Sequence, residues 1–121
     1  MSKLTFEPGS EYLYAYIESE TDSYEIALGH WREIAGELFQ RKLKRVLVHE
    51  DIIGELSDSD AFRLATELRS IGFSNVKIAI LDNHAAHRRS TEFGVLVGSN
   101  RGLLVQSFET AAEAVSWLIK Q

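Results

Sequence analysis

Two short polar segments hold many of the side chains in this 121-residue chain that could do chemistry. The first, His49-Glu50-Asp51, follows the apolar run 46–48, and the second, Asp82-Asn83-His84, follows the apolar run 78–81. Ligands of open parallel sheets bind beyond the carboxyl ends of the strands. If the two apolar runs form neighbouring strands, we expect both polar segments to lie on one rim of the sheet.

Such a rim could bind several kinds of ligand, although the simplest interpretation is that its residues are ordinary polar loop ends. Histidine and carboxylate side chains can hold a divalent metal, but their spacing here matches no metal-binding motif. An arginine can hold a phosphate or a carboxylate, and a ladder of tyrosines can wall an apolar ligand. We name no metal ligand and no cofactor. The candidate ligand-binding residues are Tyr14, His49, Asp51, Asp82, His84 and Arg88.

No segment has the pattern of a known catalytic motif. The chain lacks Gly-x-Ser-x-Gly, and the glycine-rich stretch 94–102 lacks the Gly-Lys-Ser/Thr ending of a phosphate-binding loop. A receiver-type phosphoacceptor site would need a lysine on the last strand, which instead ends in Gln106-Ser107-Phe108. There is no cysteine for a thiolate nucleophile or a thiolate metal site. We therefore expect a protein that is not an enzyme.

Composition argues against several further classes. With 13 Lys+Arg against 18 Asp+Glu, the formal net charge is −5, which disfavours a general nucleic-acid binder. No run approaches the ~18 consecutive apolar residues of a membrane span. Residues 1–8 do not resemble a signal peptide. We expect a cytoplasmic protein without stable membrane insertion, folded as one domain over residues 1–121.

Strand and helix patterns alternate along most of the chain. Because strands that alternate with helices pair in parallel, this order predicts a parallel sheet. A hairpin turning at Pro8-Gly9 adds an antiparallel element. We predict an α/β fold with a mixed, mostly parallel sheet of four to five strands, flanked by about four helices. The expected strands are 3–6, 11–18, 45–49, 76–81 and 103–108.

Capping residues and apolar stripes predict the helices. Asp22 or Ser23, Ser57 and Thr110 are suited to begin three of them, and Gly72 is suited to end the second. In the third helix, expected over 84–97, we assign the apolar face to Ala86, Phe93, Leu96 and Val97. We expect six aromatic residues to face the core: Trp31, Phe39, Phe62, Phe93, Phe108 and Trp117.

Two segments of the C-terminal half resemble a known family. Residues 75–82, Asn-Val-Lys-Ile-Ala-Ile-Leu-Asp, and residues 108–118, Phe-Glu-Thr-Ala-Ala-Glu-Ala-Val-Ser-Trp-Leu, are similar to segments of the SpoIIAA-like family, which belongs to the wider STAS group. The resemblance implies the same order of strands and helices as predicted above. STAS domains act as anti-sigma-factor antagonists, as cytoplasmic modules of anion transporters and as sensors of small ligands. The family positions are filled by Phe108, Ala114, Trp117 and Leu118.

The same resemblance implies a phosphorylation candidate. The antagonists are switched by phosphorylation of a serine in an Asp-Ser-x-Gly motif at the start of a helix. The corresponding segment here is Asp58-Ser59-Asp60-Ala61, so Ser59 is the residue that can be carried over, although the glycine is missing. The simpler alternative is that Ser57 and Ser59 only cap and solvate the start of the helix.

Taken together, these features predict a non-enzymatic regulatory or binding module. We expect it to act by contact with a protein partner, or by binding a small apolar or anionic ligand. The alternative is an enzyme, metal or anion site at the rim of His49, Asp51, Asp82 and His84. A third hypothesis is a homodimer, which an uncovered aromatic sheet face would favour.

Overall fold

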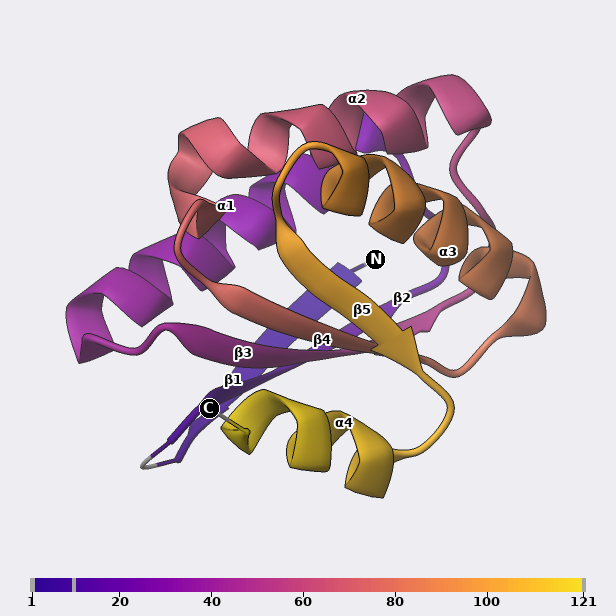
Figure 1. Ribbon diagram of the computed structural model, residues 1–121. Coiled ribbons are helices and arrows are strands. Elements are labelled where there is room, and N and C mark those ends of the chain that lie inside the picture. Colours follow the sequence, from indigo (N-terminus) through magenta and orange to yellow (C-terminus); the bar gives the residue numbers. More distant parts are fainter. Residues whose placement is uncertain (1, 10, 121) are drawn as a thin grey trace.

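The computed structural model describes residues 2–9 and 11–120, and its centre is a five-stranded sheet (Figure 1). The first two strands pair antiparallel as a hairpin, and the remaining strands add in parallel. The predicted mixed, mostly parallel sheet is therefore confirmed. In their order across the sheet, the strands are β1 (Ser2–Pro8), β2 (Leu13–Ser19), β3 (Arg45–Ile52), β4 (Lys77–Asp82) and β5 (Leu104–Phe108).

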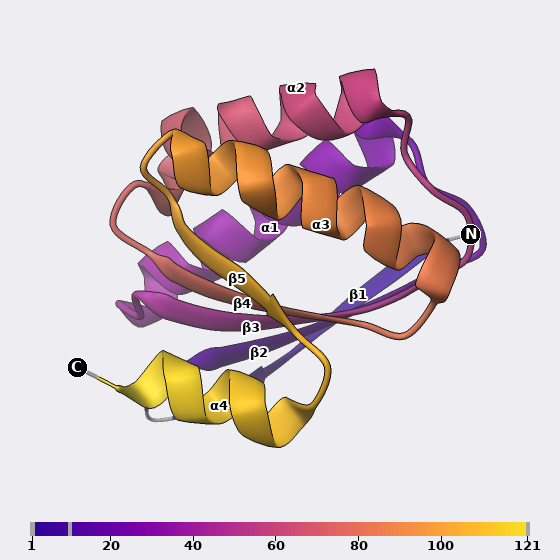
Figure 2. The same ribbon diagram turned by 45° about the vertical axis from the view of Figure 1, so that its right-hand side comes forward.

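Helices cover both faces of the sheet (Figure 2). The first face carries α1 (Tyr24–Arg41), α2 (Asp58–Leu68) and α3 (Ala85–Asn100), and the second carries α4 (Ala111–Ile119). A π-helical turn, η1 (Arg69–Phe73), follows α2 and contains Gly72 at φ 128°. No helix within the described part of the chain is long and apolar enough to cross a membrane.

The predicted caps begin three of the helices. The Ser23 hydroxyl accepts a hydrogen bond from the backbone N–H of Ile26 at the start of α1. The hydroxyl of Ser57 accepts from the N–H of Asp60 at the start of α2, and the hydroxyl of Thr110 accepts from the N–H of Glu113 at the start of α4. These bonds satisfy N–H groups that have no partner within the helix.

Strand alternation divides the core into two clusters. Residues such as Ile17, Val48 and Ile78 face α1 and α2 and form the larger cluster with Ile34 and Leu68. The opposite face forms a smaller cluster beneath α4. This second cluster contains the buried residues Leu47, Ala79, Leu81, Ala114 and Leu118, with the half-buried Tyr12 and Tyr14 packed beside them.

The strand predicted over 45–49 extends to Ile52, because its pairing with β2 continues until Ser19 lies opposite Ile52. His49, Glu50 and Asp51 therefore lie within β3 rather than after it. Since successive side chains of a strand point to opposite faces, Glu50 points away from its two neighbours. It is buried on the face of α1–α3, whereas His49 and Asp51 lie half-buried on the face of α4.

Two of the aromatic residues assigned to the core are exposed, so that prediction is wrong for Phe39 (85% exposed) and Phe62 (43%). On α1 the buried stripe ends with Ile34 and Leu38, and Phe39 lies about 100° further around the helix. On α2 the buried residues are Ala61, Ala65 and Leu68, and Phe62 is again one position off that stripe.

The face assigned to α3 is also wrong in part. Val97 is buried as predicted, but Ala86 and Leu96 are exposed. Polar side chains occupy the buried face at the first half of the helix instead. The buried residues of α3 are His87, Ser90, Thr91, Val97 and Gly98.

Candidate functional site

The polar segments of the two central strands form two separate clusters, one on each face of the sheet. We call them the rim cluster and the buried cluster. The rim cluster lies on the face of α4 and consists of Tyr14, Tyr16, His49, Asp51, Asn83 and His84. The buried cluster lies on the face of α1–α3 and consists of Asp22, Glu50, Asp82, His87 and Thr91.

In the rim cluster, each ring nitrogen of His49 has a hydrogen-bond partner. Nδ1 lies 2.7 Å from the hydroxyl of Tyr14, and Nε2 lies 2.9 Å from Oδ1 of Asn83. Burial is the largest cause that raises the pKa of Tyr14. The ring of Tyr16 packs edge-on against His49 at 5.2 Å between centroids. Tyrosine side chains of β2 and the loop that follows β4 thus hold the imidazole of His49 in place.

Asp51 organises the other half of the rim cluster. Tyr16 donates to its Oδ2 at 2.9 Å, and Nε2 of His84 donates to its Oδ1 at 2.5 Å. These hydrogen bonds, that of Tyr16 first, lower the pKa of Asp51. The same bond to Asp51 raises the pKa of Tyr16 to about 12. Asp51 and His84 keep 28% and 38% of their side chains exposed, so solvent reaches this pair.

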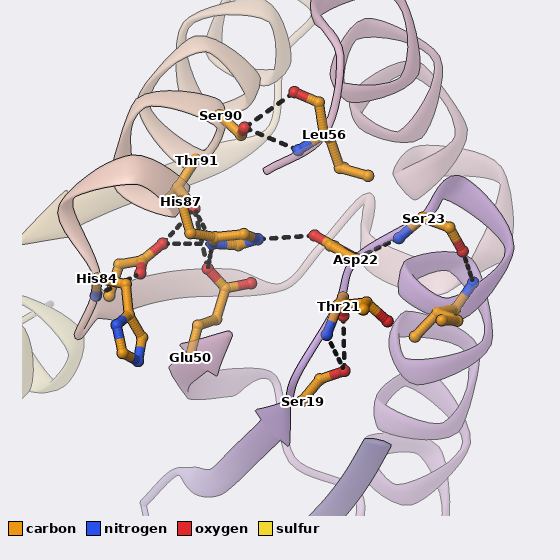
Figure 3. Close-up of polar contacts among 12 residues, drawn as sticks. Ser19, Thr21, Asp22, Ser23, Glu50, Leu56, His84, His87, Ser90 and Thr91 are labelled. Carbon is orange, nitrogen blue, oxygen red and sulfur yellow. Dashed lines mark hydrogen bonds and ion pairs between the residues drawn. The ribbon is translucent and has the colours of Figure 1, made fainter. Parts of the chain in front are cut away.

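The buried cluster joins four elements around one imidazole (Figure 3). Nε2 of His87 lies 2.7 Å from Oδ2 of Asp22, which follows β2, and Nδ1 lies 2.6 Å from Oδ2 of Asp82, at the end of β4. Oε1 of Glu50, on β3, lies 3.8 Å from Nδ1. The side chains of all four residues are at most 7% exposed.

Burial and pairing act against each other on these groups. Burial alone would lower the pKa of His87, but its hydrogen bonds to Asp22 and Asp82 outweigh that effect and raise the pKa to about 10. Burial would raise the pKa of Asp82, but the hydrogen bonds from His87 and Thr91 lower it. For Glu50 burial prevails and raises the pKa to about 8. At neutral pH the cluster therefore holds an imidazolium between two carboxylates.

A cavity of about 70 Å³ lies beside the buried cluster, between the sheet and helices α1–α3. Its walls are mostly apolar and include Trp31 and Leu56, whereas Asp22, Glu50 and His87 form a polar end. Pockets for small organic ligands usually exceed about 300 Å³. The cavity is therefore suited to water or a small ion rather than to a lipid.

The structure brings together only some of the predicted ligand-binding residues. Strands β3 and β4 are neighbours, as the rim interpretation requires, and Asp51 contacts His84. The carboxylate of Asp82, however, points into the buried cluster. Arg88 is exposed and donates from Nη2 to the backbone carbonyl of Asp82 at 3.3 Å. That Tyr14, His49 and their neighbours bind a ligand stays a prediction.

The sequence places Glu50, Asp82 and His87 on the same rim as the other polar residues, and it does not separate them into a buried cluster. It offers Asp22 only as a helix cap and does not point to Thr91. Two signals were available. Glu50 is an even number of positions from Val46, Val48 and Ile52, so its side chain points to the same face of the strand as theirs. His87, Ser90 and Thr91 follow the i, i+3, i+4 spacing of one helix face.

Comparison with known proteins identifies the fold. No protein-family model matches this chain, and no curated protein sequence matches it significantly. Several solved structures match it, and two of them resemble it over nearly their whole length. The crystal structure of an anti-sigma factor antagonist from Mycobacterium paratuberculosis has a TM-score of 0.66 at 10% sequence identity, covering 99% of this chain and 96% of that one.

The second is the anti-sigma factor antagonist SpoIIAA in its unphosphorylated form. Its TM-score is 0.57 at 15% identity, and the match covers 95% of each chain. Both identities are low, so the likeness concerns the fold. This chain therefore has the fold of the SpoIIAA-like, or STAS, domains, as the resemblance of residues 75–82 and 108–118 implied.

Proposed function

We propose that this protein is a non-enzymatic regulatory module that acts by contact with a protein partner. The observation that carries the proposal is the match of 99% of this chain to 96% of an anti-sigma factor antagonist, and a second similar structure is also that of an antagonist. Fold alone does not determine function, so the proposal also needs a surface at which a partner can bind.

The start of α2 offers such a surface. Ser59 lies in the first turn of α2 and is exposed. Phe62, three positions later on the same helix face, keeps 43% of its surface exposed, and the guanidinium of Arg101 lies over its ring at 4.9 Å. An exposed aromatic ring beside an arginine has the composition of a protein–protein contact.

Ser59 is our phosphorylation candidate on this surface. Among the described residues its hydroxyl has no hydrogen-bond partner, whereas the hydroxyl of Ser57 is occupied by the N–H of Asp60. A phosphate would add a charge of about −2 at a helix N-terminus, which stabilises negative charge. Asp58 and Asp60 would oppose it. The added charge would therefore act mainly on a partner that approaches this surface.

The proposal can be tested by photo-crosslinking in the cells that naturally make the protein. A photoreactive phenylalanine analogue is placed at Phe62 in one variant and at Phe39 in another. Phe39 is a matched control because it is also an exposed phenylalanine, at the far end of α1. We expect a crosslink to one defined protein from position 62 and none from position 39.

Ser59→Glu in the same background should remove the crosslink, and Ser59→Ala should retain it. The proposal fails if neither position yields a crosslinked protein. It also fails if the crosslink forms equally from both positions, because contact would then not depend on the start of α2.

Ligand binding at the rim cluster is the second candidate function, favoured by the solvent access of His84 and Arg88. Native mass spectrometry of the untagged protein tests it, with a denaturing run on the same sample. Extra mass that disappears on denaturation would indicate a ligand. The same spectrum tests the homodimer hypothesis, since a dimer would appear at twice the mass.

A further inference from the structure

We propose that Glu50, Asp82 and His87 form a binding site for one divalent transition-metal cation, with Asp22 as the residue that orients the histidine. The proposal concerns the face of α1–α3 and does not depend on the partner surface at the start of α2.

The first argument is the geometry of the donor atoms. One ligand atom from each of Glu50, Asp82 and His87 lies within 4.8 Å of the others, and the three side chains come from β3, β4 and α3. Oγ1 of Thr91 lies 2.9 Å from Oε1 of Glu50, 2.8 Å from Oδ2 of Asp82 and 3.5 Å from Nδ1 of His87, so the three donor atoms surround one hydroxyl. Figure 3 shows Glu50 and His87 pointing towards Thr91. Because rigid strands and a helix position them, the donors are held in place without a mobile loop.

The second argument is an imbalance of charge. Three carboxylates surround one imidazole, and among the described residues the nearby guanidinium of Arg88 donates a hydrogen bond only to a backbone carbonyl. Buried charges are costly unless they are paired. A divalent cation brings two positive charges among these three carboxylates, where a protonated imidazole brings one.

The third argument is an oxygen atom without a partner. Both oxygens of Asp22 and both oxygens of Asp82 accept hydrogen bonds. Glu50 accepts from Thr91 through Oε1, and Thr91 has one hydroxyl proton for two carboxylates. Within the described residues, Oε2 of Glu50 has no hydrogen-bond partner. Since no fully enclosed side-chain oxygen there lacks a partner, Oε2 keeps some accessible surface, and Glu50 lines the cavity.

A cation would use the existing contacts of His87. In metal sites a coordinating histidine usually donates its other ring N–H to a carboxylate, which fixes the tautomer. Nε2 already lies 2.7 Å from Asp22, which leaves Nδ1 as the donor atom. On binding, the cation replaces the proton between Nδ1 and Asp82. That proton is released to solvent, so no oxidant or reductant is involved.

The donor set selects the kind of metal. One imidazole nitrogen with two carboxylate oxygens suits Zn²⁺, Mn²⁺ or Co²⁺, whereas Ca²⁺ and Mg²⁺ prefer oxygen ligands alone. The cavity beside Glu50 leaves room for a water molecule as a further ligand.

The test uses the untagged, full-length protein after treatment with a chelator. Zn²⁺ and Co²⁺ are titrated at about pH 8, because the ligands must lose protons. Calorimetry reports stoichiometry, and the visible spectrum of Co²⁺ reports its coordination. We expect one equivalent per chain, weakened about 10–100-fold by Asp22→Asn, the usual effect of removing a second-shell partner. In Glu50→Gln the binding of this one equivalent of metal should be lost.

The rim variant Asp51→Asn with His84→Gln is the matched control, because it removes the other histidine–carboxylate pair, which is accessible to solvent. It should bind metal as the wild type does. Glu50→Gln retains the volume of the side chain, and circular dichroism checks that it is folded. The proposal is overturned if the wild type binds no metal, if Glu50→Gln binds it equally, or if only the rim variant loses it.

Discussion

The rim cluster and the buried cluster each place a carboxylate of β3 beside a histidine that follows β4, yet the two pairs differ strongly in their exposure to solvent. Glu50 and Asp51 are consecutive residues of β3, and His84 and His87 lie three positions apart. Asp51 pairs with His84 where water reaches both, whereas Glu50 lies beside His87 in the interior. One residue along a strand decides which environment a carboxylate enters.

The difference teaches what each cluster contributes to stability. A solvent-exposed ion pair contributes about 0–1 kcal/mol, because water and salt screen the charges. Removing one partner of a buried pair costs about 3–5 kcal/mol, since the remaining charge stays in the interior without compensation. The buried cluster should therefore hold the loop after β2, the end of β4 and the start of α3 together, and the rim cluster should not.

The largest expected effect comes from His87→Ala. It leaves Asp22 and Asp82 buried without the imidazolium between them, so we expect the free energy of unfolding to fall by about 3–5 kcal/mol. Urea denaturation followed by circular dichroism measures the change. The matched variant His84→Ala removes a histidine that is also paired with an aspartate and should cost at most about 1 kcal/mol.

Equal losses in the two variants would contradict the comparison. They would mean either that the interior cluster is hydrated in solution or that the rim pair is more rigid than its exposure indicates.

The fold could be predicted because its signals are local. The caps at Ser57 and Thr110 and the order of strands depend on residues a few positions apart, and all were confirmed. The end of β3 was harder to predict from the sequence, because the charged residues Glu50 and Asp51 indicate that the strand has ended. They continue the strand because β2 pairs with both residues and β4 pairs with Glu50.

The buried cluster could not be predicted, because its contacts are distant in the chain. Asp22 lies 65 positions from His87, and no local pattern pairs them. This pairing also goes with the face of α3 that is buried. A rule that buries apolar residues would turn Leu96 towards the core, whereas the structure buries Thr91 and exposes Leu96. A polar stripe on a helix face indicates a buried network only when the opposing residues are known.

The second prediction concerns the pH dependence of stability, measured in the presence of a chelator. The pKa of His87 is about 10 in the folded protein, above its usual 6.5, so its contribution is complete below pH 6.5 and is lost as the pH rises towards 10. Glu50, with a pKa raised from 4.5 to about 8, has the same sign. Urea denaturation at several pH values should show stability falling between pH 6.5 and 10.

Glu50→Gln should make this decline shallower between pH 6.5 and 8, because one fewer group loses a proton there. His84→Gln, on the rim, should leave the decline unchanged. Other groups affect stability in acid, below this window: burial lowers the pKa of His30, hydrogen bonds from Tyr16 and His84 lower that of Asp51, and hydrogen bonds from His87 and Thr91 lower that of Asp82. Stability that stays constant from pH 6.5 to 10 would show that His87 is not held as an imidazolium.

A smaller effect is expected from Thr91→Val, which keeps the shape of the side chain and removes the hydroxyl. Thr91 donates towards Glu50 and Asp82, so its loss leaves buried acceptors with fewer donors and should cost about 1–3 kcal/mol. Thr66→Val on α2 is the matched control, because its hydroxyl bonds only to the exposed carbonyl of Arg63. Urea denaturation should show little change for the control. A similar fall in the free energy of unfolding for both variants would mean that the loss comes from placing valine in a helix, not from the buried cluster.

The smallest effect on stability should come from Asp51→Asn in the rim cluster, at about 0–1 kcal/mol. Its clearest readout is Tyr16, whose pKa of about 12 depends first on the hydrogen bond to Asp51. The substitution should bring that pKa towards the usual 10, which a ¹³C NMR titration of labelled tyrosine can follow. An unchanged pKa would mean that the bond is not made in solution. If Asp51→Asn instead altered the decline in stability above pH 6.5, the two clusters would be coupled through β3, and their separation by the sheet would not hold.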